Sequence, residues 1–388
     1  MGDMTTLIPN QRHLFDIPGE VAYLNCATMG PLPKTAVEAG KIGLARKAQP
    51  WNIPSEDFFK DTASLRPKLA RLIHADTDGI AFVPSVSYAI ATAMQNIELS
   101  GGQDILILED QFPSNVYAWR EVAARTGANL VTVKDPGGNA PPSDAFLEAI
   151  GPNTGLVTCA QVRWTDGAKL DLNAIGARCR EVGAALVLDL TQSCGAMVFD
   201  VNMVQPDFMV AAGYKWMLGP YATGFMYAAP HRRDGKPLEH NWITRKGARD
   251  FTRLTDYQDA FAPGAERYDV GERSNFALLP ALETAIDLIL DWGIDNIEAT
   301  LGQQNAALAD RLNAMGLSCP DATRRGAHYL GARLPADTPQ DLTERLKAEH
   351  IHVSKPKDSL RITPHLYNTQ DDMDRLIDAL GKHLSRAS

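Results

Sequence analysis

The stretch DFMVAAGYKWMLGPYATGFMYAA, residues 207–229, holds two short apolar segments separated by a glycine-rich loop. The segments Asp207–Gly213 and Thr223–Ala229 have the length and composition of buried strands. Lys215 is the only charged residue between Asp207 and His231. Buried lysines are rare in proteins unless they are paired or chemically employed. The stretch therefore predicts two neighbouring strands with a functional lysine between them.

The residues upstream of this stretch alternate between apolar runs and helical patterns. Strands are predicted at residues 104–110, 129–134, 155–162 and 185–190, and helices at 115–127 and 172–183. Continuous apolar strands that alternate with helices are typical of a mostly parallel sheet covered on both faces. We expect a three-layer α/β/α large domain.

The pattern changes after about Leu278. Helical spacing runs through residues 278–316, followed by strands at 327–334 and 359–365. A helix over 338–351, with Thr338 as its N-cap, lies between these strands, and a last helix begins at Thr369. The sequence predicts a large domain at 20–270 and a smaller α+β domain formed by 271–388 with 1–19.

Composition excludes several function classes. The net charge of -9 over 388 residues argues against nucleic acid as a partner. The five cysteines contain no CxxC pair, so neither a disulfide framework nor a metal site is expected. No signal peptide and no apolar run of about 20 residues is visible, which predicts a cytoplasmic protein without a membrane partner.

A helix start after the strand end at residues 82–83 could hold an anion. Ser85 and Ser87 lie where free N–H groups and the positive end of the helix dipole attract negative charge. The alternative is a plain N-cap, in which Ser85 satisfies the helix and binds nothing.

A carboxylate follows the strand at 185–190. Asp189 lies near the carboxyl end of this strand, where open parallel sheets bind ligands, and Gln192 follows three residues later. A structural role for Asp189, as a cap or an ion-pair partner, is the alternative.

A phosphate anchor, a carboxylate and a lysine occur in this order along the chain. Together they meet the requirements of pyridoxal 5'-phosphate (PLP), whose phosphate, ring nitrogen and aldehyde must each be held by the protein.

The chain resembles the class V aminotransferase family, within the fold type I (aspartate-aminotransferase-like) superfamily of PLP enzymes. Related groups are selenocysteine lyases and cysteine desulfurases, kynureninases and isopenicillin N epimerases. The segments that carry the resemblance are YLNCATMGPLP (23–33), SVSYAI (85–90), EDQFPSN (109–115), LDLTQS (188–193), GYKWMLGP (213–220) and LRITPHLYNTQDDMD (360–374).

The resemblance implies roles for several residues around the cofactor. It implies a phosphate site at Val86 and Ser87 with Tyr214 nearby, ring stacking by Phe112, a ring-nitrogen partner in Asp189, a 3'-oxygen partner in Gln192 and a Schiff base on Lys215. Arg361 would grip the substrate α-carboxylate, with Asn25 and Trp164 also lining the substrate site. Ser274 and Asn275 would reach the phosphate of a partner subunit, which implies a homodimer. A core phenylalanine at Phe112 and a surface arginine at Arg361 are the alternatives.

The resemblance leaves the reaction open. Desulfurases carry a nucleophilic cysteine shortly before the carboxylate-binding arginine, and residues 345–363 contain none. This argues against persulfide chemistry. We expect an aminotransferase that acts on an α-amino acid or a close analogue through Lys215. A β-lyase (C–S lyase or kynureninase-like) or an epimerase is the alternative, and a non-catalytic binding protein of the same fold is the rival of another class.

Overall fold

The computed structural model describes residues 5–136 and 141–384. The two ends of the predicted small domain, 1–4 and 385–388, lie outside the described residues. A seven-stranded sheet has the order β2-β8-β7-β6-β5-β3-β4. Its strands are β2 (Ile80–Phe82), β3 (Asp104–Leu108), β4 (Asn129–Val133), β5 (Thr154–Ala160), β6 (Ala185–Asp189), β7 (Phe208–Ala212) and β8 (Gly224–Ala228). Only β8 runs antiparallel to its neighbours, so the prediction of a mostly parallel sheet is confirmed.

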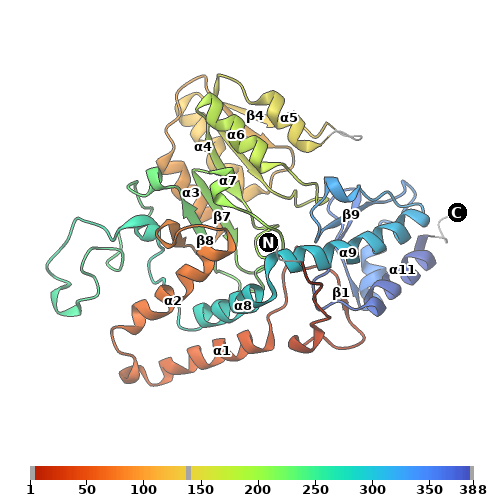
Figure 1. Cartoon of the computed structure of the whole chain (residues 1–388), viewed down its shortest axis with the longest axis horizontal. Coiled ribbons are helices and arrows are strands. Elements are labelled where there is room, and N and C mark those ends of the chain that lie inside the picture. The colour runs from red at the N-terminus through yellow and green to blue at the C-terminus, as the bar shows by residue number, and fades with distance from the viewer. Residues whose placement is uncertain (1–4, 137–140, 385–388) are drawn as a thin grey trace.

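Both faces of this sheet are covered. Every residue of β5, β6 and β7 is buried, as expected for strands packed on two sides. Successive strand residues belong to opposite cores: Leu186 and Leu188 to one, Ala185 and Val187 to the other. Helices lie on either side of the strands in Figure 1. The three-layer α/β/α fold is therefore confirmed.

The helices of this region end where the sequence predicts. Gly127 and Gly183 adopt left-handed conformations after two of them, as glycine does at many helix C-termini. The helices are α1 (Lys34–Ala45), α2 (Asp57–Leu72), α3 (Val86–Asn96), α4 (Tyr117–Thr126), α5 (Pro142–Ala149), α6 (Leu172–Val182) and α7 (Val201–Val204).

A further core, separate from the two that cover the sheet, lies at the right of Figure 1. It contains the parallel pair β1 (Ala22–Tyr23) and β10 (Ile351–His352) and the antiparallel pair β9 (Leu330–Arg333) and β11 (Ser359–Ile362). α10 (Leu342–Ala348) and α11 (Gln370–Leu384) pack against them. β1 lies in the segment predicted for the large domain but pairs with β10, and the domain boundaries stay a prediction.

Two details of the C-terminal half differ from the predictions. The predicted helix over 278–316 is interrupted at Gly293, whose φ of 78° separates α8 (Leu278–Trp292) from α9 (Ile294–Ala314). The N-cap prediction for Thr338 is wrong. Its hydroxyl donates backward to the carbonyl of Pro335, and α10 begins only after Asp341.

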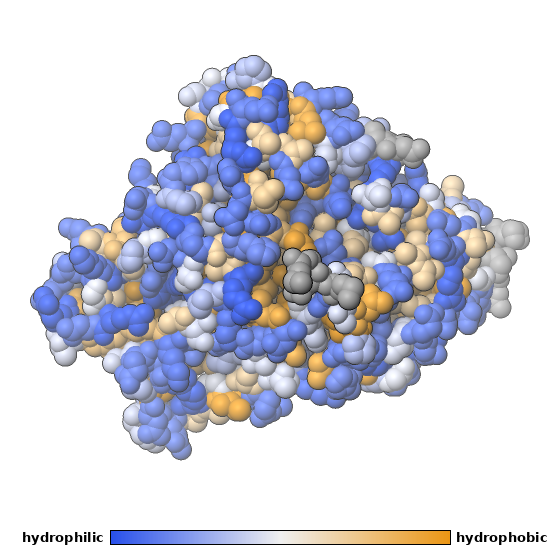
Figure 2. All heavy atoms as spheres, viewed as in Figure 1, coloured by the Kyte–Doolittle hydropathy of each residue, from blue (hydrophilic) through white to orange (hydrophobic). Residues whose placement is uncertain are grey.

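Within the described ranges, no helix combines the length and apolar character that crossing a membrane requires. Figure 2 shows that the face seen in Figure 1 is mostly hydrophilic, with hydrophobic side chains gathered near its centre.

Candidate active site

The lysine loop, residues 213–224, connects β7 to β8 at the carboxyl end of β7. The segment 25–30 packs directly on it, because the Gly30 N–H donates to the carbonyl of Tyr214 at 2.8 Å. A Cβ on Gly30 would lie 2.2 Å from the carbonyl oxygen of Lys215. Only glycine therefore allows this close approach, which holds the lysine against the segment that follows β1.

Lys215 is buried with its amine between aromatic rings. The residue is 6% exposed, and Nζ lies 5.4 Å from the ring centroid of Phe112 and 5.5 Å from that of Tyr214. Burial lowers the pKa of Lys215 to about 8; Asp189 opposes this effect and Arg361 adds to it. Burial thus makes the neutral amine, which is the form that attacks an aldehyde, more readily available than in a free lysine.

Asp189 ends β6 in the middle of the sheet, with β5 and β7 on either side. It is 5% exposed, and its Oδ1 accepts a hydrogen bond from the Thr191 N–H at 3.0 Å. Burial raises the pKa of the Asp189 carboxyl, against the hydrogen bonds from Thr191 and the charge of Lys215. No arginine, lysine or histidine of the described residues forms a salt bridge with it. The predicted alternative of an ion-pair partner is therefore wrong within the described chain.

A small cavity of about 20 Å³ lies beside Asp189, and Phe112, Trp164 and Gln192 also line it. The rings of Phe112 and Trp164 meet edge to face with centroids 5.6 Å apart. The Trp164 indole donates to the carbonyl of Asp110 at 2.6 Å. Phe112 is 37% exposed, so the alternative of a core phenylalanine is wrong.

The start of α3 lies at the same end of the sheet, since the Val83 N–H donates to the carbonyl of Gly224 at the end of the lysine loop. Ser85 is the N-cap and accepts from the Tyr88 N–H at 3.2 Å. The Ser85 and Ser87 hydroxyls lie 3.0 Å apart. The N–H groups of Val86 and Ser87 have no partner within the helix, because the first turn lacks the preceding carbonyls. Ser85 thus caps the helix and leaves donors for an anion.

Arg361 on β11 is 5% exposed, so the alternative of a surface arginine is wrong. Its Nε donates to Ser354 Oγ at 2.7 Å and its Nη1 to the Trp164 carbonyl at 3.1 Å. Its Nη2 donates to Thr28 Oγ1 and lies 3.5 Å from Asn25 Oδ1. All four partners are neutral, and no carboxylate of the described residues pairs with Arg361. The site therefore holds a buried positive charge without a negative partner.

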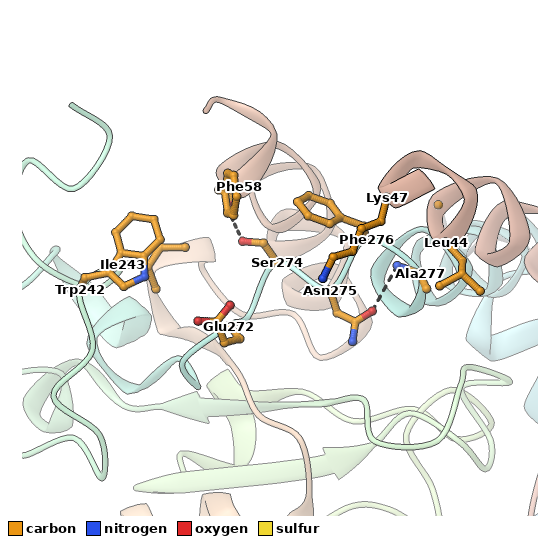
Figure 3. A pocket seen from close by; sticks show the side chains of 11 residues that line it. Leu44, Lys47, Phe58, Trp242, Ile243, Glu272, Ser274, Asn275, Phe276 and Ala277 are labelled. Carbon is orange, nitrogen blue, oxygen red and sulfur yellow. Dashed lines mark hydrogen bonds between the residues drawn. The ribbon is translucent and has the colours of Figure 1, made fainter. Parts of the chain in front are cut away.

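Ser274 and Asn275 line the pocket of Figure 3, which also includes Phe58 and Trp242, and Asn275 also lines a pocket with Pro84 and Gly224 near the start of α3. The Ser274 hydroxyl donates to the carbonyl of Phe58. Asn275 Oδ1 accepts from the N–H groups at the start of α8, at 3.1 Å from Ala277 and 2.9 Å from Leu278. The two side chains thus have partners within their own chain, and their predicted role toward a partner subunit stays a prediction.

Three residues around the site are not identified by the sequence patterns. Thr28 and Ser354 both contact the Arg361 guanidinium, and Trp216 contacts Gln192. Thr28 follows a short strand in the segment 23–33, so its place after a strand end was the available signal. Ser354 reaches the site through an isolated bridge to Arg361, and no sequence pattern marks such a contact.

Cys319 is the one cysteine of the described residues that is not fully buried. It lines a groove that also includes Pro356 and Lys357, just before Arg361. Burial raises the pKa of its thiol to about 11, so the thiol stays protonated at neutral pH and is a weak nucleophile. The described residues also hold no group of three or more His, Cys, Asp or Glu side chains placed to bind a metal ion.

Comparisons with known proteins bear on this geometry. The sequence model of the family Aminotransferase class-V matches residues 52–376. Isopenicillin N epimerase of Streptomyces clavuligerus is 27% identical over 378 residues, covering 93% of this chain and 94% of that protein. Kynureninase of Deinococcus radiodurans is 28% identical over 298 residues, covering 73% of this chain and 69% of its own.

Solved structures share the fold. A mutant of C-DES with glycine covalently linked to its PLP cofactor superposes with a TM-score of 0.87 at 20% identity. The superposition covers 96% of this chain and 99% of that structure.

Proposed function

The chain belongs to the class V aminotransferase family of PLP-dependent enzymes, and from this membership we propose that it acts on an α-amino acid or a close analogue at the site around Lys215. The favoured reaction is transamination. The alternatives are epimerisation and elimination by a β-lyase of the C–S lyase or kynureninase type. The similarity to an isopenicillin N epimerase and to a kynureninase supports both alternatives.

The residues present fit PLP. A buried Asp189 without a cationic partner suits a protonated ring nitrogen, and a Lys215 with a lowered pKa suits an aldehyde. The free N–H groups of Val86 and Ser87 suit a phosphate. When bound, PLP supplies an aldehyde that condenses with amines and a ring that takes up negative charge from the substrate Cα.

Five further residues complete the proposed cofactor site. Phe112 would cover one face of the ring and Gln192 would donate to its oxygen, while Tyr214 would lie near the phosphate. Ser274 and Asn275 would approach the phosphate of a second subunit. Cavity lining by Phe112 and Gln192 supports the first two roles.

The main observation that supports an amino-acid substrate is the unpaired charge of Arg361. A planar guanidinium binds a carboxylate through two parallel hydrogen bonds, and a buried charge without a partner is costly. Asn25 and Trp164 would hold the guanidinium in place, since each contacts it directly. A substrate carboxylate at Arg361 brings the amino group and Cα toward Lys215.

Lys215 Nζ would then take the proton of the substrate Cα. A base works best when its pKa is near the working pH, and burial brings the pKa of Lys215 to about 8. The apolar rings of Phe112 and Tyr214 exclude water from this amine. The protonated thiol of Cys319 and the absence of cysteine from residues 345–363 disfavour persulfide formation.

We also propose a homodimer, a cytoplasmic location and the domain division at residue 270. Large apolar side chains on and after α1 support the dimer: Ile42 is 61% exposed, Leu44 68% and Trp51 78%. Leu44 lines the pocket of Figure 3 together with Ser274 and Asn275. Light scattering of the purified protein tests the dimer, and a monomer at micromolar concentration contradicts it.

The strands β2 to β8 all lie within 20–270, which supports the proposed domain division at residue 270.

The reaction is tested with a panel of amino acids and the PLP-loaded protein. Transamination releases the keto acid without ammonia, and an epimerase yields the opposite enantiomer. A C–S lyase releases a keto acid, ammonia and the leaving thiol, whereas a kynureninase-type lyase releases a shortened amino acid and no ammonia. Failure of every amino acid to react or to bind contradicts the proposed function.

A further inference from the structure

Trp216, the residue after Lys215 in the lysine loop, is fully buried. Its indole Nε1 donates to Gln192 Oε1 at 3.1 Å. The indole ring meets the ring of His328 edge to face, with centroids 4.2 Å apart, and lies 6.0 Å from that of His365. Packing on both sides therefore fixes the direction in which the indole N–H points.

The Gln192 amide could be placed in two ways, because its oxygen and nitrogen ends have nearly the same shape and opposite hydrogen-bonding roles. The indole N–H of Trp216 can only donate, so Oε1 must face it. At the other end, Nε2 lies 3.1 Å from the carbonyl oxygen of Ala27, which can only accept. Both neighbours demand the same orientation.

The backbone of Gln192 is held as well. His328 Nε2 lies 2.6 Å from the Gln192 carbonyl, so this nitrogen must carry the proton. Burial lowers the pKa of His328 to about 4, and the ring is neutral at physiological pH. Trp216 and His328 thus form a fixed wall behind Gln192.

A side-chain amide nitrogen carries two N–H groups, and Ala27 accepts only one of them. Gln192 lines the same cavity as Asp189 and Phe112, so the second N–H is available on the ligand side. The opposite orientation would present a carbonyl oxygen there, which repels an anionic ring oxygen.

We propose that Trp216 is a positioning residue that fixes the Gln192 amide with its N–H toward the ring oxygen of the cofactor. The inference rests on the proposed function, because it requires PLP at Lys215. It adds a specific role for the residue after the lysine.

The chain offers a matched control. Trp119 is also fully buried and donates its indole N–H to a side-chain amide oxygen, that of Asn115, at 3.0 Å. Asn115 also accepts from Thr158 Oγ1 at 2.9 Å, and its Nδ2 has no partner among the described residues. Trp119→Phe therefore removes the same kind of hydrogen bond away from Gln192.

The test is a pH titration of the visible absorption of the PLP-loaded protein, for the wild type, Trp216→Phe, Trp119→Phe, Gln192→Leu and Trp216→Phe/Gln192→Leu. A donor to the ring oxygen stabilises its negative charge in the deprotonated form of the lysine-bound cofactor. Its loss should raise the apparent pKa of the spectral change by about one unit. We expect this shift in Trp216→Phe and Gln192→Leu, no shift in Trp119→Phe, and no further shift in the double variant.

An unchanged titration of Trp216→Phe overturns the proposal. A full additional shift in the double variant also overturns it, because Trp216 would then act independently of Gln192. If Trp216→Phe does not fold, benzothienylalanine at position 216 removes the N–H and keeps the ring shape, and the same outcomes apply. If the wild type does not attach PLP at Lys215, the proposed function itself fails before the variants are compared.

Discussion

Replacement of Arg361 by glutamine separates substrate binding from folding. Arg361 has only neutral partners, so Arg361→Gln removes a charge without leaving a buried carboxylate unpaired. Two charge-assisted hydrogen bonds to a substrate carboxylate, at about 1.5 kcal/mol each, amount to a loss of roughly a hundredfold in affinity. The free energy of unfolding should change by about 1 kcal/mol or less.

The assay is a spectroscopic titration of the PLP-loaded variant with an amino acid and with the corresponding amine that lacks the carboxylate. Arg361→Gln should weaken binding of the amino acid and leave binding of the amine unchanged. Equal effects on both ligands, or on neither, would refute a carboxylate-binding role for Arg361.

Arg66 gives a matched control for burial. It is 8% exposed and pairs with Asp269 at 2.6 Å, on the β2 side of the sheet. Arg66→Gln breaks a buried ion pair, while Asp269 keeps its pair with Arg273, and should lower the free energy of unfolding by about 2 kcal/mol. The affinity ratio between amino acid and amine should stay at the wild-type value in this variant.

Two further predictions concern the stability of the chain. Between pH 8 and 10.5 the unfolded chain binds more protons at Lys215 than the folded chain does, because burial lowers the pKa of Lys215 to about 8. The free energy of unfolding of the wild-type apoprotein should therefore rise with pH over this window. Apo Lys215→Met should be more stable than wild type at pH 7 by about 3 kcal/mol, and this difference should disappear near pH 10.5. Urea unfolding across pH measures the difference in stability, and a difference that stays constant with pH contradicts the prediction. Asn275→Ala should lower the free energy of unfolding by about 1 kcal/mol, because the side chain caps α8 through the N–H groups of Ala277 and Leu278, and an unchanged denaturation midpoint contradicts the cap.

The sequence predicted the central sheet well because its signals are local. Buried parallel strands such as β6 and β7 are continuously apolar, and glycine at Gly127 and Gly183 marks helix ends through its left-handed conformation. The predicted Thr338 cap failed because the Thr338 hydroxyl donates to the Pro335 carbonyl and the helix begins only after Asp341. Thr and Asp are both common N-cap residues, and sequence alone does not rank them.

Local sequence patterns marked the candidate site only where one segment carries the whole signal, and the family resemblance supplied Arg361, Asn25 and Trp164. Lys215 and Asp189 each follow an apolar strand, which marks them directly. The contacts of Arg361 with Asn25 and Thr28 join segments more than 300 residues apart. The role of Trp216 depends on the direction of one indole N–H, and only the folded packing against His328 sets it.

The central claim is that Lys215 carries PLP. The direct measurement is reduction of the PLP-loaded protein with borohydride, followed by proteolysis and mass spectrometry of the labelled peptide. We predict one phosphopyridoxyl group per chain, on the peptide that contains Lys215, and none on Lys215→Ala. Labelling of a different lysine, or a wild-type protein that takes up no label after incubation with PLP, would contradict the account.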